Sequence, residues 1–202
     1  MNQIATNAGD ELRRARLESG LSQMKLANFA NTFSEEISQI ETGLHKISFE
    51  QLQILLSLTQ HRLVSIPTNA KTPEEISGFI KSAIDAENPR RAYRAFLAFS
   101  KTLQLLDPAV RLALTLNRPE STGDRLYDAA IASLIQHWLQ SDSLPVPFWV
   151  NEESFFLQKP THFGYAYLAA LPTFDESPLA FKQHNVIFSA VALETGLSSM
   201  ND

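Results

Sequence analysis

The feature that most constrains this chain is the spacing of apolar and turn residues in its first third. Between residues 10 and 66, helical periods of apolar residues are separated by short breaks at Gly20, Asn31 and Gly43. Glycine and asparagine tolerate positive φ angles, so each break is suited to end a helix in a tight turn. The order helix, helix, tight turn, helix, helix predicts a compact helical domain over residues 1–66.

Individual residues in this domain support that order. Ser22 is suited to cap the helix QMKLANFA. Thr32 and Glu35 have the spacing of a capping box, in which two side chains satisfy each other's free backbone N–H groups at a helix start. We expect the inward-facing residues of these two helices to be Leu26, Phe29, Ala30, Ile37 and Ile40.

These residues carry a resemblance that covers about a third of the chain. The matching positions are Leu12-x-x-x-Arg16, Gly20-Leu-Ser-Gln23, Leu26-Ala27, Ile37-Ser-x-Ile-Glu41-x-Gly43, and then Ser48 with the helix LQILLSL. In this pattern the segment resembles the Xre/Cro/CI family of helix-turn-helix domains. The resemblance implies a DNA-binding domain of four or five helices.

The resemblance also assigns roles to positions of this chain. It implies that the helix after Ser22 lies across the phosphate backbone and that a helix at about 33–42 enters the major groove of double-stranded DNA. It pairs Arg16 with Glu41 in an ion pair that ties the first helix to the third; we expect this pair to be structural. The residues that it places at DNA are Gln23, Ser34, Glu35, Ser38, Gln39, and the loop residues His45 and Lys46, for which an ordinary solvated loop is an equal alternative.

The chemistry of this face supports DNA reading but also raises a difficulty. Gln39 can pair bidentately with adenine, and Ser34 or Ser38 can bond a phosphate or a base edge. Glu35 or Glu36 can accept a hydrogen bond from cytosine, yet acids near phosphates lower affinity. The capping box accounts for Glu35 and leaves Glu36 unexplained. We therefore expect weak intrinsic binding, strengthened by a homodimer on a palindromic operator or by a partner protein.

The charge distribution agrees with a partner besides DNA. Residues 1–66 carry six basic and seven acidic side chains, residues 67–141 carry nine and eight, and residues 142–202 carry two and seven. No segment is strongly basic, which counts against DNA as the sole partner. The acidic last segment suits a basic partner surface, although a solvated acidic face is the more frequent cause of such a balance.

Other classes of protein are disfavoured by what the chain lacks. No apolar run approaches the roughly 20 residues that cross a bilayer, and the N-terminus has no apolar signal-peptide core. With no cysteine and no histidines at metal-ligand spacing, we expect no metal and no cofactor, and we expect a cytoplasmic protein.

The remaining two thirds also read as mainly helical. Two prolines in the polar stretch 67–73 predict a linker. The domain 74–202 is expected to be a helical bundle for partner binding or dimerisation, with an aromatic- and proline-rich, irregular part at 144–202. Helices are expected at about 74–84, 89–106, 108–116 and 124–140, shorter helices at YAYLAAL (165–171) and SPLAFKQH (177–184), and a strand or extended segment at NVIFS (185–189).

Three segments of this domain resemble a group of bacterial regulators encoded beside toxin genes, particularly nucleotidyltransferase-like toxins. The segments are Thr122-Gly-Asp124-x-x-x-Asp128-Ala-Ala, Val146-Pro-Phe-Trp149, and Phe181-Lys-Gln-His-Asn-Val-Ile-Phe-Ser189-x-x-x-Leu193. The resemblance implies a repressor of its own operon that also neutralises a cognate toxin protein. The chain lacks the Gly-Ser plus Asp-x-Asp pattern of a nucleotidyltransferase, so it would be the antitoxin.

Two other interpretations remain open from the sequence. A stand-alone repressor would sense a small molecule in a pocket lined by Trp149, Tyr165 and Tyr167, although core packing is the commoner role for aromatic residues. An enzyme would use Asp124 and Asp128 with His137, but Asp124 is more simply a helix N-cap, so we expect no catalytic residues. Three arginines at 90, 91 and 94 offer an anion or DNA contact, for which solvent-facing side chains are the commoner reading.

Overall fold

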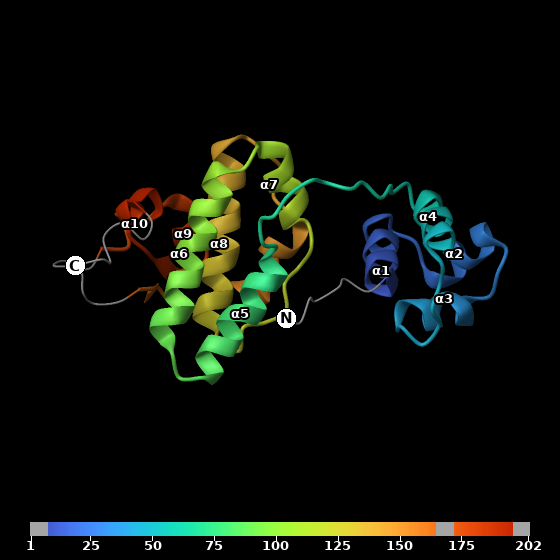
Figure 1. The fold of residues 1–202 in the computed structure, drawn as a ribbon, viewed down its shortest axis with the longest axis horizontal. Coiled ribbons are helices and arrows are strands. Elements are labelled where there is room, and N and C mark those ends of the chain that lie inside the picture. Colours follow the sequence, from blue (N-terminus) through green and yellow to red (C-terminus); the bar gives the residue numbers. More distant parts are fainter. Residues whose placement is uncertain (1–7, 165–171, 196–202) are drawn as a thin grey trace. The chain divides into compact units, whose positions relative to one another are not determined.

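The computed structural model describes residues 8–164 and 172–195 of the chain, which is mainly helical in these ranges (Figure 1). The chain divides into two compact units, Met1–Pro67 (unit 1) and Thr68–Asp202 (unit 2). The boundary falls within the stretch predicted as a linker. The short helix expected at 165–171 lies outside the described residues. None of the helices in the described ranges is long and apolar enough to cross a membrane.

Unit 1 packs four helices around one small core. Gly20 and Gly43, at the predicted breaks, both have positive φ angles. A capping box between Ser48 and Gln51 starts the last of the four helices. The helices are α1 (Ala8–Glu18), α2 (Gln23–Ala30), α3 (Ser34–Glu41) and α4 (Phe49–Leu58), and the core consists of Leu12, Ala15, Leu26, Ala27, Ile37, Ile40, Leu52, Leu55 and Leu56.

One residue expected in this core points outward. The side chain of Phe29 is 59% exposed, whereas Leu26 is fully buried. In a helix of only eight residues, Leu26 and Ala27 already fill the face toward α3 and α4, and Phe29 lies two positions further round. The expectation that Phe29 faces inward was therefore wrong.

The first helices of unit 2 begin where the sequence places a cap followed by proline. Thr72 and Glu75 form a complete capping box, and the side chains of Asn88 and Asp107 each accept a backbone N–H of the first turn. Proline follows each of these caps, where its missing N–H is harmless. The observed ends lie within one residue of the predicted ones: α5 (Pro73–Asp85), α6 (Pro89–Leu105), α7 (Pro108–Thr115) and α8 (Arg125–Ser141).

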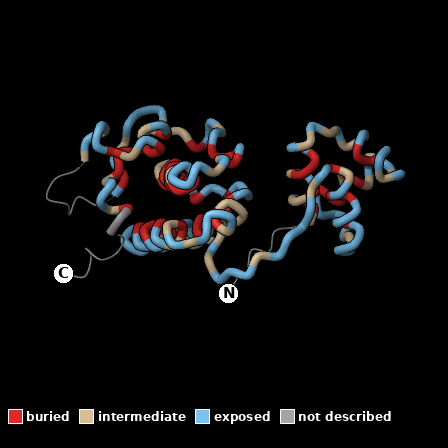
Figure 2. Tube along the Cα trace, turned by 90° about the horizontal axis from the view of Figure 1, so that it is seen from above, coloured by how far each residue is buried: buried red, intermediate tan, exposed pale blue. Residues whose placement is uncertain are grey.

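Helix α8 forms the centre of unit 2. Its residues from Tyr127 to Gln136 are buried on every side, which is the pattern of a helix enclosed by other elements. Figure 2 shows that buried residues gather inside each unit, while the segment between them is exposed. Four elements of the last part of the chain pack on α8: η1 (Phe148–Asn151), η2 (Glu153–Phe155), α9 (Leu179–Gln183) and β2 (Val186–Ile187). Strand β1 (Thr161–His162) lies against β2, and α10 (Ala190–Thr195) packs on α6.

Short strands and aromatic rings hold this last part together. Strands β1 and β2 pair in parallel, so the strand expected at 185–189 is confirmed and its partner, which was not predicted, is Thr161–His162. Aromatic rings from α6, the loop after β1 and the end of β2 meet edge to face at Phe96, Phe163 and Phe188. For Phe163 and Phe188, the interpretation of the aromatic-rich segment as core is confirmed.

Candidate nucleic-acid interface

The chain between α2 and α3 reverses direction within three residues. The hydroxyl of Ser22 accepts the backbone N–H of Lys25 at 3.1 Å and so caps α2. Asn31 then takes the left-handed conformation, with φ 54° and ψ 45°. The backbone N–H of Thr32 donates to the carbonyl of Ala27 at 2.9 Å, which closes the turn. This is the helix, tight turn and helix expected from the sequence.

The capping box predicted between Thr32 and Glu35 is absent. Helix α3 begins one residue later than that box requires, with Phe33 at the N-cap and no side-chain hydrogen bond there. The physical reason is that the turn already uses the backbone N–H of Thr32, so this group is not available to Glu35. Instead, the hydroxyl of Thr32 donates to the carboxylate of Glu36.

The roles of the two neighbouring acids are therefore the reverse of those expected. Glu36, which had no explanation from the sequence, is half-buried and bonds Thr32 across the start of α3. Glu35 is exposed, and its carboxylate has a long contact of 3.4 Å to the hydroxyl of Ser34. Both acids lie in the first turn of α3, where negative charge interacts favourably with the helix dipole.

A buried network holds α3 against the first two helices. The Arg16 guanidinium on α1 donates from Nε and Nη2 to the two carboxylate oxygens of Glu41, at 2.6 and 2.9 Å. Nη1 of Arg16 donates to the carbonyl of Leu21 at 2.8 Å, and the amide nitrogen of Gln23 donates to Glu41 at 2.9 Å. The expected ion pair is present, in the fork geometry that arginine favours with a carboxylate.

The protonation of this network follows from its contacts. Burial alone raises the pKa of Glu41, but the hydrogen bonds from Arg16 and Gln23 and the charge of Arg16 outweigh burial, so the pKa lies below its ordinary value. The hydrogen bond to Glu41 raises the pKa of Arg16. Both groups remain charged at neutral pH. Because Arg16 is 8% and Glu41 5% exposed, each charge depends on the other for compensation.

The opposite side of α3 carries the residues expected to read DNA. Ile37, Ile40 and Glu41 face the domain interior. The outward residues follow helical spacing, with Gln39 one turn beyond Glu35. Of the predicted contacts, those exposed are Glu35, Gln39, His45 and Lys46, and those half-buried are Gln23, Ser34, Glu36 and Ser38.

The loop after α3 is fixed relative to this face. The backbone N–H of His45 donates to the carbonyl of Gln39 at 3.0 Å, so His45 and Lys46 follow directly on the C-terminal turn of α3. Gln23 uses one hydrogen of its amide for Glu41 and retains a second one for another acceptor. Gln23 thus combines an internal bond with a partly exposed polar end at the start of α2.

Gly9 has a positioning role that was not predicted. A Cβ atom at this position of α1 would lie 2.1 Å from the carbonyl oxygen of Ile40, at the end of α3. Only glycine allows the two backbones to approach this closely. A glycine near a helix start is the only signal in the sequence, and it is a weak one.

The residues of the enzyme interpretation have structural roles in unit 2. The carboxylate of Asp128 accepts bonds from the hydroxyls of Ser121 and Thr122 at 2.6 and 2.7 Å, and from the Thr122 N–H at 2.8 Å. Asp124 caps α8 through the N–H of Leu126. Burial lowers the pKa of His137, whose ring packs against Trp138 and Phe181.

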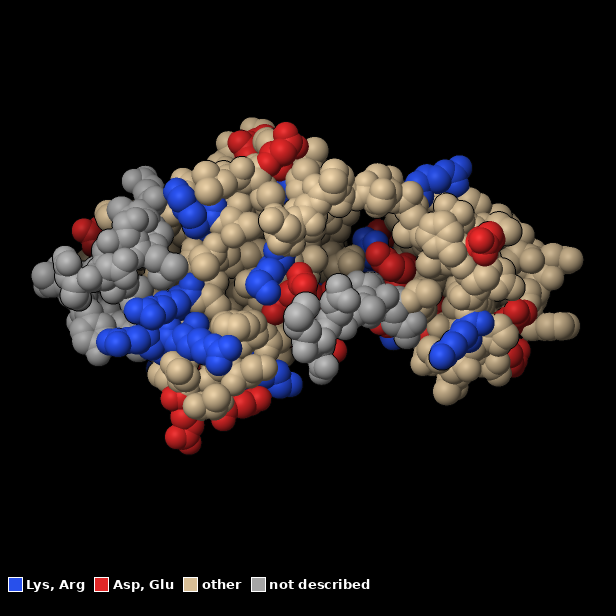
Figure 3. All heavy atoms as spheres, in the orientation of Figure 1, with Lys and Arg blue, Asp and Glu red and all other residues tan. Residues whose placement is uncertain are grey.

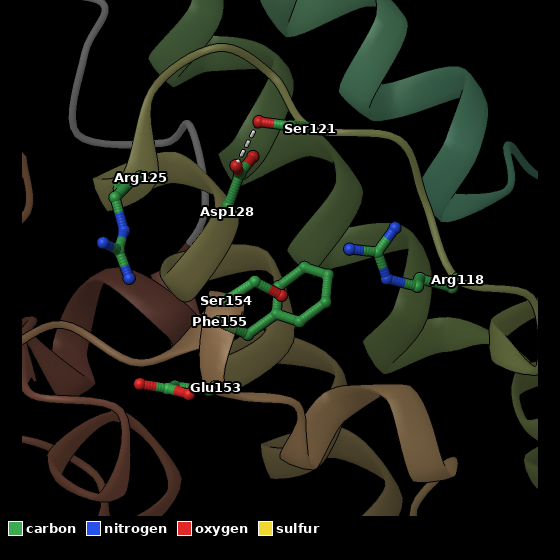
Figure 4. A pocket seen from close by; sticks show the side chains of 7 residues that line it. All are labelled: Arg118, Ser121, Arg125, Asp128, Glu153, Ser154 and Phe155. Carbon is green, nitrogen blue, oxygen red and sulfur yellow. Dashed lines mark hydrogen bonds between the residues drawn. The ribbon is translucent and has the colours of Figure 1, made fainter.

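A pocket of about 400 Å³ opens beside Asp128 (Figure 4). Its two arginines lie on opposite sides of Ser154 and Phe155 in this view. Arg118 pairs with Glu152 at 2.8 Å, and Arg125 donates to the carbonyl of Phe156 at 3.3 Å. Both arginines of the pocket therefore have partners within unit 2.

The three segments that resemble antitoxin-type regulators meet around α8. Trp149 is buried, and its indole N–H donates to the carbonyl of Thr115 at 3.1 Å. The ring of His184 bonds the carbonyl of Phe155 and the side-chain oxygen of Gln136, at 2.9 and 2.8 Å. Trp149 is therefore a core residue, and Tyr165 and Tyr167 lie outside the described residues.

Comparisons with protein-family models, with curated proteins and with solved structures find no match to this chain.

Proposed function

We propose that unit 1 is an Xre-type helix-turn-helix domain and that the protein is a sequence-specific transcriptional repressor. In this proposal it acts as the antitoxin of a toxin–antitoxin pair: it represses its own operon through unit 1 and binds the toxin protein through unit 2. It works as a homodimer on a palindromic operator, in which each α3 reads one half-site.

The observation that carries the DNA-binding part is the way in which α3 is held. Arg16, Gln23 and Glu41 fix its inner side through a buried network, and its outer side presents Glu35 and Gln39 to solvent. A helix fixed in this manner positions side chains for base readout with little loss of conformational freedom on binding. Arg16 and Glu41 are too buried to contact DNA themselves.

The antitoxin part is supported by the resemblance of the three segments of unit 2. Their buried members, among them Trp149, Phe181 and Phe188, maintain the core around α8, so we assign the toxin contact to exposed residues of unit 2, which include Phe148 of the second segment. This separates the two activities between the two units. A substitution on the outer face of α3 should therefore abolish DNA binding and leave toxin binding unchanged.

A gel shift with the DNA upstream of the operon, combined with co-expression of the adjacent gene product, tests the proposal. The full-length protein is expected to shift the promoter fragment and to copurify with the neighbouring protein. Gln39→Ala should weaken the shift by roughly 5- to 150-fold, since a bidentate adenine contact contributes roughly 1–3 kcal/mol. Copurification should be unchanged.

The matched control is Gln53→Ala, which removes an exposed glutamine from α4 instead of α3. It should leave the shift within about twofold of the unmodified protein, as expected for a surface change outside a binding site. A protein that does not shift the promoter would disprove DNA binding. A shift without a complex with the neighbouring protein would disprove the antitoxin role alone.

A further inference from the structure

A groove of about 960 Å³ runs along α6 in unit 2, between this helix, α5 and the residues just before α5. Its cationic lining residues are Lys71, Arg90, Arg91 and Arg94. Its partly or fully exposed apolar lining includes Phe79, Ala98 and Leu105. Figure 3 shows basic side chains gathered over the N-terminal part of α6. The groove thus combines positive charge with apolar surface.

Within the described residues, the four cations of the groove have no carboxylate partner. Among the residues that the structure describes, no carboxylate oxygen lies within 4.0 Å of any of them. No aspartate or glutamate lines the groove. The guanidinium of Arg91 lies 4.7 Å from the centre of the Phe79 ring, a cation–π contact that orients the side chain but does not cancel its charge.

The position of these arginines in α6 is unfavourable for the helix alone. Arg90 and Arg91 lie in the first turn, which contains no acidic residue, and the dipole of a helix disfavours cations at this end. Arg90 and Arg94 are four residues apart, so two like charges lie on one helix face. A local arrangement that opposes helix stability and leaves charge unpaired indicates a binding site.

The length and chemistry of the groove indicate what it binds. From Arg90 to Leu105 the lining follows α6 for about 22 Å, at 1.5 Å for each residue. Leu105 is 73% exposed, so the groove is open toward solvent. A DNA backbone would pair with the arginines but would leave the apolar surface uncovered. A small ligand is usually enclosed far more completely than this groove allows.

We propose that this groove binds an acidic amphipathic helix of a partner protein. The apolar face of that helix packs on Phe79, Ala98 and Leu105, and carboxylates along its edge pair with the arginines and Lys71. This inference specifies the partner-binding surface of the proposed function and rests on that function only for the identity of the partner. Its test measures peptide binding directly, so the two can fail separately.

The test uses the full-length protein and a fluorescein-labelled synthetic helix of about 15 residues, the length of the groove. The probe carries leucine at positions i, i+3, i+4 and i+7 and glutamate along the flanking edge. A second peptide has lysine in place of each glutamate, and a third has the same composition in scrambled order. Fluorescence anisotropy is expected to show saturable binding of the acidic amphipathic peptide and not of the other two.

The decisive variant reverses two charges of the groove, Arg90→Glu with Arg94→Glu. It should weaken peptide binding by at least tenfold, and Leu105→Ser should weaken it severalfold. The matched control is Lys81→Glu with Lys101→Glu, which reverses two exposed charges on α5 and α6 that do not line the groove. The control should change binding by less than threefold. Tryptophan fluorescence, from Trp138 and Trp149, confirms that unit 2 stays folded.

Several results would overturn the proposal. The first is that the acidic peptide does not bind. The second is that the Lys81→Glu, Lys101→Glu control loses as much peptide affinity as the groove variant. The third is that decanoate displaces the labelled peptide at a lower concentration than unlabelled peptide does. The last result would assign the groove to a small amphipathic anion. A promoter shift that is lost in the Arg90→Glu, Arg94→Glu protein would assign it to DNA, and a dimer that dissociates in this protein would assign it to a second copy of the chain.

Discussion

In unit 1, Arg14 and Arg16 are both held by carboxylates of the same unit, whereas in unit 2 Arg90, Arg91 and Arg94 line a groove without such partners. Arg14 and Arg16 therefore contribute mainly to the stability of unit 1. Arg90, Arg91 and Arg94 remain available to a ligand. In the proposed function, Arg14 and Arg16 thus add little positive potential to the candidate DNA-reading face, and we expect base contacts and dimerisation to supply most of its affinity.

The largest expected effect comes from breaking the buried pair of unit 1. Arg16→Ala leaves Glu41 as a buried charge without its main partner, and we expect the free energy of unfolding of unit 1 to fall by about 3–5 kcal/mol. Both tryptophans are in unit 2, so tryptophan fluorescence reports on unit 2 and far-UV circular dichroism on both units. The circular dichroism transition should shift to lower temperature while the fluorescence transition stays in place.

A control for this experiment is Arg14→Ala. Its pairs with Glu11 and Glu18 are partly exposed, and surface pairs of this kind contribute at most about 1 kcal/mol. Equal destabilisation by the two substitutions, or a fluorescence transition that moves with Arg16→Ala, would contradict the distinction between the units.

The next effect is a difference in acid sensitivity between the units. In unit 2, burial lowers the pKa of His184, although its bond to the carbonyl of Phe155 opposes this, so the folded state disfavours the proton. In the unfolded chain His184 binds a proton near its ordinary pKa of 6.5. Unit 2 should therefore lose stability as the pH falls through 6.5 toward the lower pKa of the folded state, because only the unfolded chain gains the proton there. Burial also lowers the pKa of His137, so this residue contributes to the same loss of stability.

Unit 1 should respond at lower pH. The pKa of Glu41 is lowered from 4.5, so the stabilisation from its ionised form is complete above pH 4.5 and is lost as the pH falls through the folded pKa. Melting curves at about pH 7.5 and 5.5 should therefore show a fluorescence transition that shifts in unit 2 and a unit 1 transition that does not. In His184→Gln the shift should be smaller; an unchanged shift would exclude His184 as its source.

The smallest effect concerns the two acids of α3. Glu35→Gln removes an exposed negative charge and should raise affinity for non-specific DNA by a few fold, at about the scale of one charge near the phosphates. Glu36→Gln removes the charge-assisted bond from Thr32 and should instead lower stability by about 1 kcal/mol. Competition gel shifts measure the change in DNA affinity, and denaturation measures the change in stability. Tighter DNA binding by Glu36→Gln alone would contradict the assignment.

Local signals in the sequence were enough to predict the long helices of both units. Asn88-Pro89 and Asp107-Pro108 each combine a cap with a preformed first-turn angle, and the helices begin there. Burial of Leu26, Ile37 and Ile40 follows from helical periodicity alone. These signals depend on neighbours within a few residues, which a single sequence displays directly.

The features that were missed depend on tertiary geometry, or on two acceptors that compete for the same backbone N–H. Thr32 has the right spacing for a capping box with Glu35, but its N–H is used by the preceding turn. The groove joins Lys71 and Phe79 to arginines on the next helix, and no spacing rule relates these positions. Strand β1 has two residues and pairs with a strand far along the chain, so it has no periodicity of its own.

The exposed segment between the units has a consequence for how the two proposed activities combine. Residues 59–72 connect the end of α4 to the start of α5 without helix. A tether this short holds whatever unit 2 binds at an effective concentration on the order of millimolar near the DNA occupied by unit 1. A toxin bound to unit 2 would thus be present at the operator even when it is scarce in the cell. Its concentration could then affect repression of the operon directly.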